Sequence, residues 1–420
     1  MIQDLIQQYG VSGETALDLM RRMDYIRVVG TAGEERAAAQ LLAELEAMGV
    51  SAHTESFDFP RCVAETARLM VLEPYQKEYI VTAYGFTGNA DLEAELFYAE
   101  NGDEISLSMA KGKLVLLNTP VSVALYRKLA ASGAAGFLTI SGTPLDDPEK
   151  TDLEMRALKP SYHLRDGLPK IPGATLRYLD AEELLEREAR RIRLLLDQKE
   201  EIAKANNIVA EIPGTDGGDG MIVFTAHYDS VPFSPGAYDN SAGCAIIMEL
   251  CRYFTRVPPK RRVRFLWFSG EEIGLIGSHA YCAAHRAELN EVLFGVNVDL
   301  AGHIVGSHLI SVTGEHSVRE DLEKLMRENG VGMEFLEEVC SSDSSSLADC
   351  GVPTLGFRRG GFGGHNRNDR LSLISAKALQ QSSAVLCLLA DYLVNQPEFP
   401  FPRSIPPKLQ EDLDRYFARV

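Results

Sequence analysis

The 420-residue sequence lacks an apolar run of about 18 residues, the length that a membrane-spanning helix needs, so no membrane span is expected. Its start, Met1–Leu5, lacks a basic stretch followed by an apolar one, and no secretory signal is predicted. The 7 cysteines are odd in number and show no zinc-knuckle spacing, which favours reduced and mostly buried thiols. Together these absences predict a cytoplasmic protein.

Basic residues are also few. Lys and Arg number 42 against 60 Asp and Glu, which gives a formal net charge of -18. Such a surface repels phosphate backbones, so nucleic acid is not expected as a partner. The plainest interpretation of the acidity is that it keeps the protein soluble. A hydrophobic content of 45% is ordinary for a globular chain with a core, and the length favours two domains.

From about residue 205 onward, predicted strands and helices alternate, which is typical of an α/β fold with a mostly parallel sheet. We therefore predict a three-layer αβα catalytic domain made of residues 1–62 and 196–395. Between these segments, residues 63–195 are richer in short strands and hold none of the candidate metal ligands, which predicts an inserted β-rich accessory domain. Residues 396–420 are predicted to form a Pro-rich tail with a short helix.

Two apolar strands are predicted within the insert, at residues 113–118 and 137–140. The stretch 126–135 between them is predicted to be a helix. It is expected to end at Gly136, because glycine commonly stops a helix.

Polar side chains with metal-ligand chemistry follow three predicted strands of the catalytic domain. His227 follows one apolar strand, Glu271 and Glu272 follow the next, and Asp299 ends a third. Ligands of open α/β sheets bind beyond the carboxyl ends of the strands. Three strand ends carrying such residues are a stronger signal than any one motif, and they predict a site at this edge of the sheet.

Further candidates lie in the loops. Asp229 stands two residues after His227, so both side chains point the same way on an extended segment and Asp229 can orient the imidazole. Taken alone, such a pair is more often a surface pair. Asp239 precedes a helix, where it could be a cap or a carboxylate that bridges two metals. His365 lies in a glycine-rich loop, and Asp369 is placed to orient it.

These residues form the ligand set of a two-metal hydrolase, with one carboxylate left over as a base. Their order resembles the co-catalytic di-zinc aminopeptidases and the related glutamate carboxypeptidases. Residues 63–195 resemble the protease-associated domain that this family often carries as an insert. The matching elements are His227-Tyr228-Asp229, Asp239-Asn240-Ser241-Ala242-Gly243, Glu271-Glu272, Asn297-Val298-Asp299 and His365.

The resemblance implies two Zn²⁺ ions, with Co²⁺ or Mn²⁺ as substitutes, and an aminopeptidase that uses a metal-bridged hydroxide. It assigns one metal to His227 and Asp299, the other to Glu272 and His365, both to Asp239, the general base to Glu271 and the orientation of the first imidazole to Asp229. One departure is Asn366, which stands where the family usually has Thr after its late histidine.

Two alternatives remain open from the sequence. A carboxypeptidase or aminoacyl-amide hydrolase of the same fold would use Arg358, Arg359 or Arg367 to clamp a substrate carboxylate, although the favoured interpretation is that these arginines pair with the protein's own acids. A catalytically inactive binding module is the other alternative. Peptides or small amides are the expected substrates, and a homo-oligomer is compatible with the sequence. Side-chain preference, the native metal, the oligomeric state and the role of the insert are not readable from it.

Overall fold

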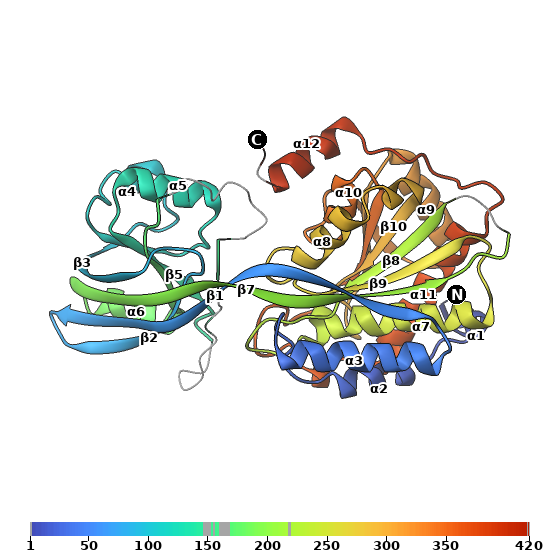
Figure 1. Cartoon of the computed structure of the whole chain (residues 1–420), viewed down its shortest axis with the longest axis horizontal. Helices are drawn as coiled ribbons and strands as arrows, with labels where there is room; N and C mark the ends of the chain where they lie inside the picture. Colours follow the sequence, from blue (N-terminus) through green and yellow to red (C-terminus); the bar gives the residue numbers. More distant parts are fainter. Residues whose placement is uncertain are drawn as a thin grey trace. The chain divides into compact units, whose positions relative to one another are not determined.

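The structure is a computed structural model that describes residues 2–145, 153, 156–158, 169–216, 220–417 and 419. The chain divides into two compact units, Met1–Phe57 with Lys204–Val420, and Asp58–Ala203 (Figure 1). The expected limits of the insert, 63 and 195, lie several residues inside the second unit. The reason is that β1 (Ala52–Glu73) and β7 (Arg191–Ile212) each continue without a break through a boundary.

The first unit is built on a mostly parallel sheet. Besides the end of β7, its strands are β8 (Met221–His227), β9 (Arg262–Phe268), β10 (Val292–Val298), β11 (His308–Thr313), β12 (Met333–Glu337) and β13 (Thr354–Arg359). They lie in the order β7-β9-β8-β10-β13-β11-β12. The pairs β8–β9, β8–β10, β10–β13 and β11–β12 are parallel, while β7–β9 and β11–β13 are antiparallel. The parallel block in the centre is the part that carries the site.

Helices cover both faces of this sheet, which confirms the predicted three-layer αβα architecture. One core is shared by α1 (Ile2–Tyr9), α2 (Gly13–Arg22), α3 (Ala32–Ala47), α7 (Ala242–Arg256), α9 (His316–Glu328) and α11 (Ala376–Asn395). A second core, on the other face, contains side chains of α8 (Ile276–Ala284) and α10 (Ser344–Asp349). Figure 1 shows α7 and α11 on one side of the sheet and α8 and α10 on the other.

The central strand β8 shows why the strands read as unbroken apolar runs. Ile222 and Phe224 point into the core beside α7, whereas Met221 and Val223 point into the core beside α8, and all four are 0% exposed. A strand that is covered on both faces has no solvated positions, and the one other polar side chain of β8, Thr225, donates to Asn297 Oδ1 at 2.6 Å. A histidine at its last position therefore needs a partner other than water.

The second unit has its own sheet and its own cores. Its strands are the adjoining parts of β1 and β7 with β2 (Lys77–Ala83), β3 (Ala90–Tyr98), β4 (Leu114–Leu117), β5 (Gly136–Ser141) and β6 (Gly173–Arg177). Leu114 and Leu116 of β4 face one core, while Val115 and Leu117 face the other. The helices α4 (Glu104–Leu107), α5 (Val123–Ser132) and α6 (Tyr178–Glu186) complete the unit.

The expected end of the helix in this unit was wrong. α5 ends at Ser132, and Gly133 is the residue that adopts the left-handed conformation, with φ 73°. Gly136 instead begins β5, where an added Cβ would lie 2.8 Å from the carbonyl oxygen of Pro172. The predicted strands at 113–118 and 137–140 match β4 and β5.

The C-terminal segment belongs to the first unit. As predicted, it contains a short helix, α12 (Pro407–Tyr416), whose Leu409 and Leu413 are buried. Pro406 and Pro407 stand at the helix start, where proline costs no backbone hydrogen bond. Among the described residues, no helix has the length and apolarity that crossing a bilayer requires.

One testable consequence of this packing concerns His308 at the start of β11. Burial, aided by the nearby Arg359 charge, lowers the pKa of His308 to about 3. The unfolded chain takes up this proton near the ordinary histidine pKa of 6.5, so stability is lost as the pH falls from 6.5 toward 3. Between pH 6.5 and 5, we expect wild type to lose about 2 kcal/mol more unfolding free energy than His308→Gln, measured by urea unfolding. The same pH dependence in both proteins would contradict this assignment.

Candidate metal centre

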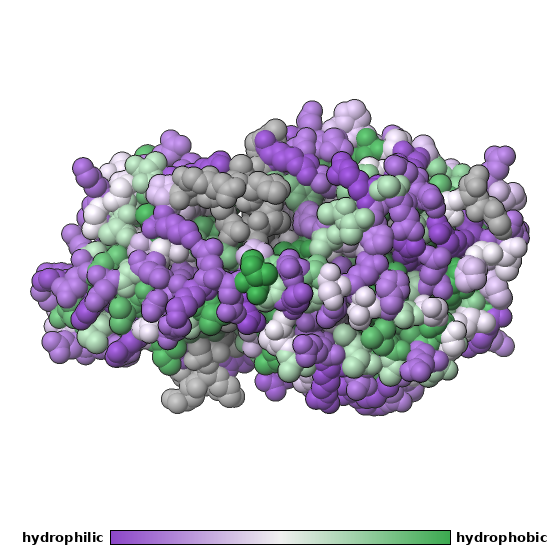
Figure 2. Space-filling model, viewed as in Figure 1, coloured by the Kyte–Doolittle hydropathy of each residue, from purple (hydrophilic) through white to green (hydrophobic). Residues whose placement is uncertain are grey.

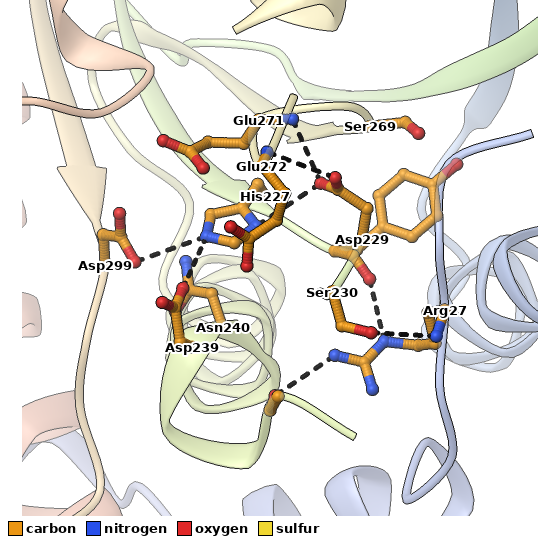
Figure 3. Close-up of polar contacts among 12 residues, drawn as sticks. Arg27, His227, Asp229, Ser230, Asp239, Asn240, Ser269, Glu271, Glu272 and Asp299 are labelled. Atoms are coloured by element: carbon orange, nitrogen blue, oxygen red, sulfur yellow. Dashed lines mark hydrogen bonds and ion pairs between the residues drawn. The ribbon is translucent and has the colours of Figure 1, made fainter. Parts of the chain in front are cut away.

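The predicted ligands come together at the carboxyl ends of three neighbouring strands. His227 is the last residue of β8, Glu271 and Glu272 follow β9, and Asp299 follows β10. Asp239 joins them from the short helical turn η2 (Ala237–Ser241), which leads directly into α7. Figure 3 shows the side chains of His227, Asp239, Glu272 and Asp299 pointing toward one another.

The first histidine is fully buried among carboxylates. His227 Nε2 lies 3.0 Å from Asp239 Oδ1 and 3.4 Å from Asp299 Oδ1. Its other ring nitrogen, Nδ1, lies 3.4 Å from Asp229 Oδ1, which agrees with the predicted orienting role of that carboxylate. His227 and Asp229 are both 0% exposed, so their mutual contact is not weakened by water.

Asp229 also connects this histidine to the glutamate pair. Its Oδ1 accepts a hydrogen bond from the backbone N–H of Glu271 at 3.2 Å, and its Oδ2 accepts one from Glu272 at 3.3 Å. Fixing both amides fixes the turn after β9. In Figure 3 the two glutamate side chains then diverge, with Glu272 directed toward Asp239 and Glu271 away from it.

The second histidine completes a second group around the same aspartate. His365 Nε2 lies 3.2 Å from Asp239 Oδ2 and 2.9 Å from Glu272 Oε2. Asp239 therefore offers one carboxylate oxygen to each histidine, which is the geometry of a bridging ligand. In both groups, His227 with Asp239 and Asp299 and His365 with Asp239 and Glu272, the potential ligand atoms lie within 4.8 Å of one another.

A neighbouring side chain leaves Asp239 free for this bridging position. Asn240 Oδ1 accepts a hydrogen bond from the N–H of Gly243 at 2.9 Å, and Asn240 Nδ2 donates to the carbonyl of Val298 at 2.8 Å. Asn240 thus satisfies the start of α7, so the alternative that Asp239 is the helix cap is excluded.

The sequence predicts that Asp369 orients His365, and the structure corrects this role. Asp369 Oδ1 accepts from the backbone N–H of Tyr238 at 2.6 Å, and Oδ2 accepts from that of Asp239 at 2.9 Å. It therefore holds the bridging aspartate. His365 has φ 55°, and Asn366, which follows it, accepts a hydrogen bond from the N–H of Asn368 at 2.8 Å.

Ser342 contacts one of the predicted ligands, although the sequence placed it only in a loop that resembles the family's substrate-facing loop. Its hydroxyl donates to Asp299 Oδ2 at 2.7 Å and accepts from Asn297 Nδ2 at 2.8 Å. Next to it, Asp343 is 0% exposed, and burial raises its pKa to about 7. No local sequence pattern signals this contact, because it depends on how the segment that leads into α10 packs against the end of β10.

Two of the three arginines predicted to clamp a substrate carboxylate bind groups of the protein itself, while the assignment of Arg367 stays a prediction. Arg358 Nη2 lies 2.9 Å from Glu338 Oε1 and donates to Ser311 Oγ at 3.1 Å. Arg359 donates to the carbonyl oxygens of His303 at 2.7 Å and Ile304 at 3.1 Å. Both guanidinium groups are thus engaged within the protein, one by an acid and the other by backbone carbonyls.

The protonation behaviour of the cluster shows a shortage of positive charge. Burial, with the Asp239 charge adding to it, raises the pKa of Glu272 to about 7, and burial also raises the pKa of Glu271. Hydrogen bonds to Asp239 and Glu272 raise the pKa of His365 to about 12. Burial opposes the ionisation of Asp239, but contacts with the two histidines hold its pKa below its usual range.

The residues fit a pair of metal ions. Among the described residues, Glu272 Oε1 and Asp299 Oδ1 are buried and have no hydrogen-bond partner. Buried carboxylate oxygens without partners are costly, and a divalent cation would compensate them. Imidazole nitrogens combined with carboxylate oxygens are the donor set that zinc accepts in catalytic sites.

Residues 207–390 match the model described as Peptidase family M28. These residues form an M28 peptidase domain. The match confirms the predicted peptidase, and all the predicted metal ligands lie inside the matched segment.

Two curated relatives show how far the similarity extends. Over 281 residues the chain is 26% identical to aminopeptidase YwaD of Bacillus subtilis, which covers 66% of this chain and 58% of YwaD. Over 401 residues it is 24% identical to mouse carboxypeptidase Q, which covers 90% of this chain and 84% of that protein. The chain thus spans less than two thirds of YwaD but most of carboxypeptidase Q.

Solved structures share the fold. The zinc aminopeptidase BSAP from Bacillus subtilis has a TM-score of 0.77 at 22% identity and covers 95% of this chain and 99% of its own. An aminopeptidase from Aneurinibacillus sp. strain AM-1 has a TM-score of 0.75 at 20% identity, with coverage of 96% and 98%. These likenesses confirm the predicted α/β fold, including its mostly parallel sheet.

A first prediction for the site concerns Asp229. Asp229→Ala would leave two partly buried amides without their acceptor and His227 without its orienting carboxylate. We expect metal affinity to fall about 10- to 100-fold, the usual effect of losing a partner of a ligating histidine. Chelator competition measures this, with Asp391→Asn as a control, because Asp391 bonds to Tyr253 and Asn395 and to none of the ligands. Unchanged affinity in Asp229→Ala would refute the role.

Proposed function

We propose that this chain is a di-zinc aminopeptidase that removes residues from the N-termini of peptides. The observation that carries the proposal is the sharing of Asp239 between two histidines, with Glu271 left outside both ligand groups. The M28 match and the two zinc or aminopeptidase structures of the same fold support it.

The residues that would hold the metals follow from the two groups. His227 and Asp299 would hold one zinc, Glu272 and His365 the other, and Asp239 both. Bound zinc would supply Lewis acidity toward the scissile carbonyl and the attacking water. The protein itself holds the five ligands in position, through hydrogen bonds made by Asp229, Asn240, Asp369 and Ser342.

Glu271 is assigned the proton transfer. It is adjacent to a ligand but points away from Asp239, so its carboxylate is free to take a proton from the attacking water and pass it to the leaving amine. Burial raises the pKa of Glu271, which moves its carboxylate toward the basicity that a general base needs.

The neighbouring arginines bear on the choice between an N-terminal and a C-terminal substrate group. Bound zinc would neutralise the carboxylates of Asp239, Asp299 and Glu272, so a substrate carboxylate would need a cation outside the ligand groups to bind it. Two of the three candidate arginines, Arg358 and Arg359, are held by Glu338 and by backbone carbonyls, which disfavours a clamp for a substrate carboxylate at these two positions. Similarity to carboxypeptidase Q over 84% of that protein keeps a carboxypeptidase as the second candidate.

The deciding experiment combines metal content with substrate choice. Purified, zinc-replete protein is analysed for metal and assayed on free and N-acetylated aminoacyl substrates and on N-blocked dipeptides. We expect about two zinc ions per chain and cleavage of the free-amine substrates alone. Cleavage restricted to substrates with a free C-terminal carboxylate would establish the carboxypeptidase, and protein without zinc or turnover would overturn the proposal.

The neighbouring glutamates provide a matched pair of variants. Glu271→Gln is expected to lower kcat by about 10²- to 10⁴-fold while zinc content stays near wild type, because Glu271 moves protons and binds no metal. Glu272→Gln should instead lower zinc content. The measurement is kcat together with zinc per chain for each variant. Loss of zinc in Glu271→Gln, or full activity, would show that the two roles are assigned wrongly.

A further inference from the structure

A buried arginine lies beneath the loop that joins two of the ligands. Arg27 belongs to the segment between α2 and α3, and it is 0% exposed. The loop 228–236 connects His227 at the end of β8 with Asp239 in η2. Figure 3 shows Arg27 joined by dashed lines to this loop, close to Ser230.

The guanidinium of Arg27 serves carbonyl groups at both ends of the loop. Its Nε donates to the carbonyl of Tyr228 at 2.8 Å, directly after His227. Its Nη2 donates to the carbonyl of Gly236 at 3.1 Å, and Nη1 donates to that of Pro235. Nη1 also donates to two carbonyls of the segment that contains Arg27, those of Met23 at 2.8 Å and Tyr25 at 3.0 Å.

Backbone contacts fasten the middle of the loop to the same residue. The N–H of Arg27 donates to Ser230 Oγ at 2.9 Å, and the N–H of Ser230 donates to the carbonyl of Arg27 at 3.2 Å. One residue thus holds the loop near its start, through Tyr228 and Ser230, and at its end, through Pro235 and Gly236.

The end of the loop has little room for adjustment. Gly236 has φ 58°, and a Cβ added there would lie 2.2 Å from the carbonyl oxygen of Asp239. Arg27 binds the carbonyl of Gly236, while Asp369 binds the amides of Tyr238 and Asp239. A cation on the carbonyl side and an anion on the amide side hold the turn that carries the bridging carboxylate.

We propose that Arg27 is a positioning residue of the metal centre, which sets the separation between His227 and Asp239 and thereby the affinity for metal. The inference rests on the proposed function in that it takes the five ligands as a metal site. A lysine keeps the charge but has a single nitrogen, which cannot reach carbonyls at both ends of the loop as the planar guanidinium does.

Arg261 offers a matched control. It is 7% exposed and, like Arg27, donates to several backbone carbonyls, those of Val394 at 3.3 Å, Gln396 at 2.6 Å and Pro397 at 3.3 Å. These carbonyls lie at the end of α11 and beyond, and none belongs to a ligand loop. A loss of general stability should therefore appear in Arg261→Lys as well as in Arg27→Lys, whereas a loss of metal affinity should not.

The experiment measures zinc affinity of the full chain by chelator competition, with the melting temperature of the zinc-free protein recorded beside it. We expect Arg27→Lys and Arg27→Met to bind zinc at least about tenfold more weakly than wild type, as for other residues that orient ligands. Arg261→Lys should have a lower melting temperature than wild type. Its zinc affinity should stay within about twofold of wild type, which corresponds to less free energy than one hydrogen bond contributes.

Ser230→Ala covers the case in which Arg27 variants do not fold. It removes one hydrogen bond to the Arg27 backbone with little change in volume, and about fivefold weaker zinc binding is expected. Folded Arg27→Lys with wild-type affinity, equal weakening in Arg261→Lys, or unchanged affinity in Ser230→Ala would each overturn the inference. Wild type that binds no zinc would instead overturn the proposed function, so the two failures are distinguishable.

Discussion

The site depends on one carboxylate shared by two imidazoles. Asp239 faces His227 with one oxygen and His365 with the other, and these histidines come from parts of the chain 138 residues apart in a single fold. A bridging carboxylate works only if its backbone is held still. Here that backbone is held by Asn240 on the helix side and by Asp369 on its amides.

The electrostatic consequence of this arrangement is a concentration of negative charge without enough cations. Burial raises the pKa of both glutamates, and carboxylates raise the pKa of His365. A cluster of this kind is costly in a folded protein unless something positive compensates it. The negative charge that destabilises the metal-free site is the same charge that a divalent ion would compensate.

Much of this was predictable because a buried parallel sheet leaves a clear pattern. β8, β9 and β10 are mostly apolar and buried, so the polar residues at and beyond their ends stand out, and His227, Glu272 and Asp299 were predicted as ligands on that ground. The structure brings these three residues into the two groups that could hold a metal. Contacts between distant segments were not predictable in this way. The role of Asp369, the link of Ser342 to Asp299, and the engagement of Arg358 by Glu338 each depend on how loops pack. The protease-associated character of residues 63–195 and the cytoplasmic location stay predictions.

The sequence by itself determined the chemistry of the site. The hydrophobic pattern marks where each buried strand ends, and the type of residue found there can be read directly from the sequence. It also determined the layered α/β architecture, since the alternation of strands and helices limits how a sheet can be covered. The tertiary structure alone decided which oxygen of Asp239 meets which histidine, which glycine ends α5, and that Arg27 lies under the ligand loop. Those depend on contacts between residues far apart in the chain, and no local pattern records them.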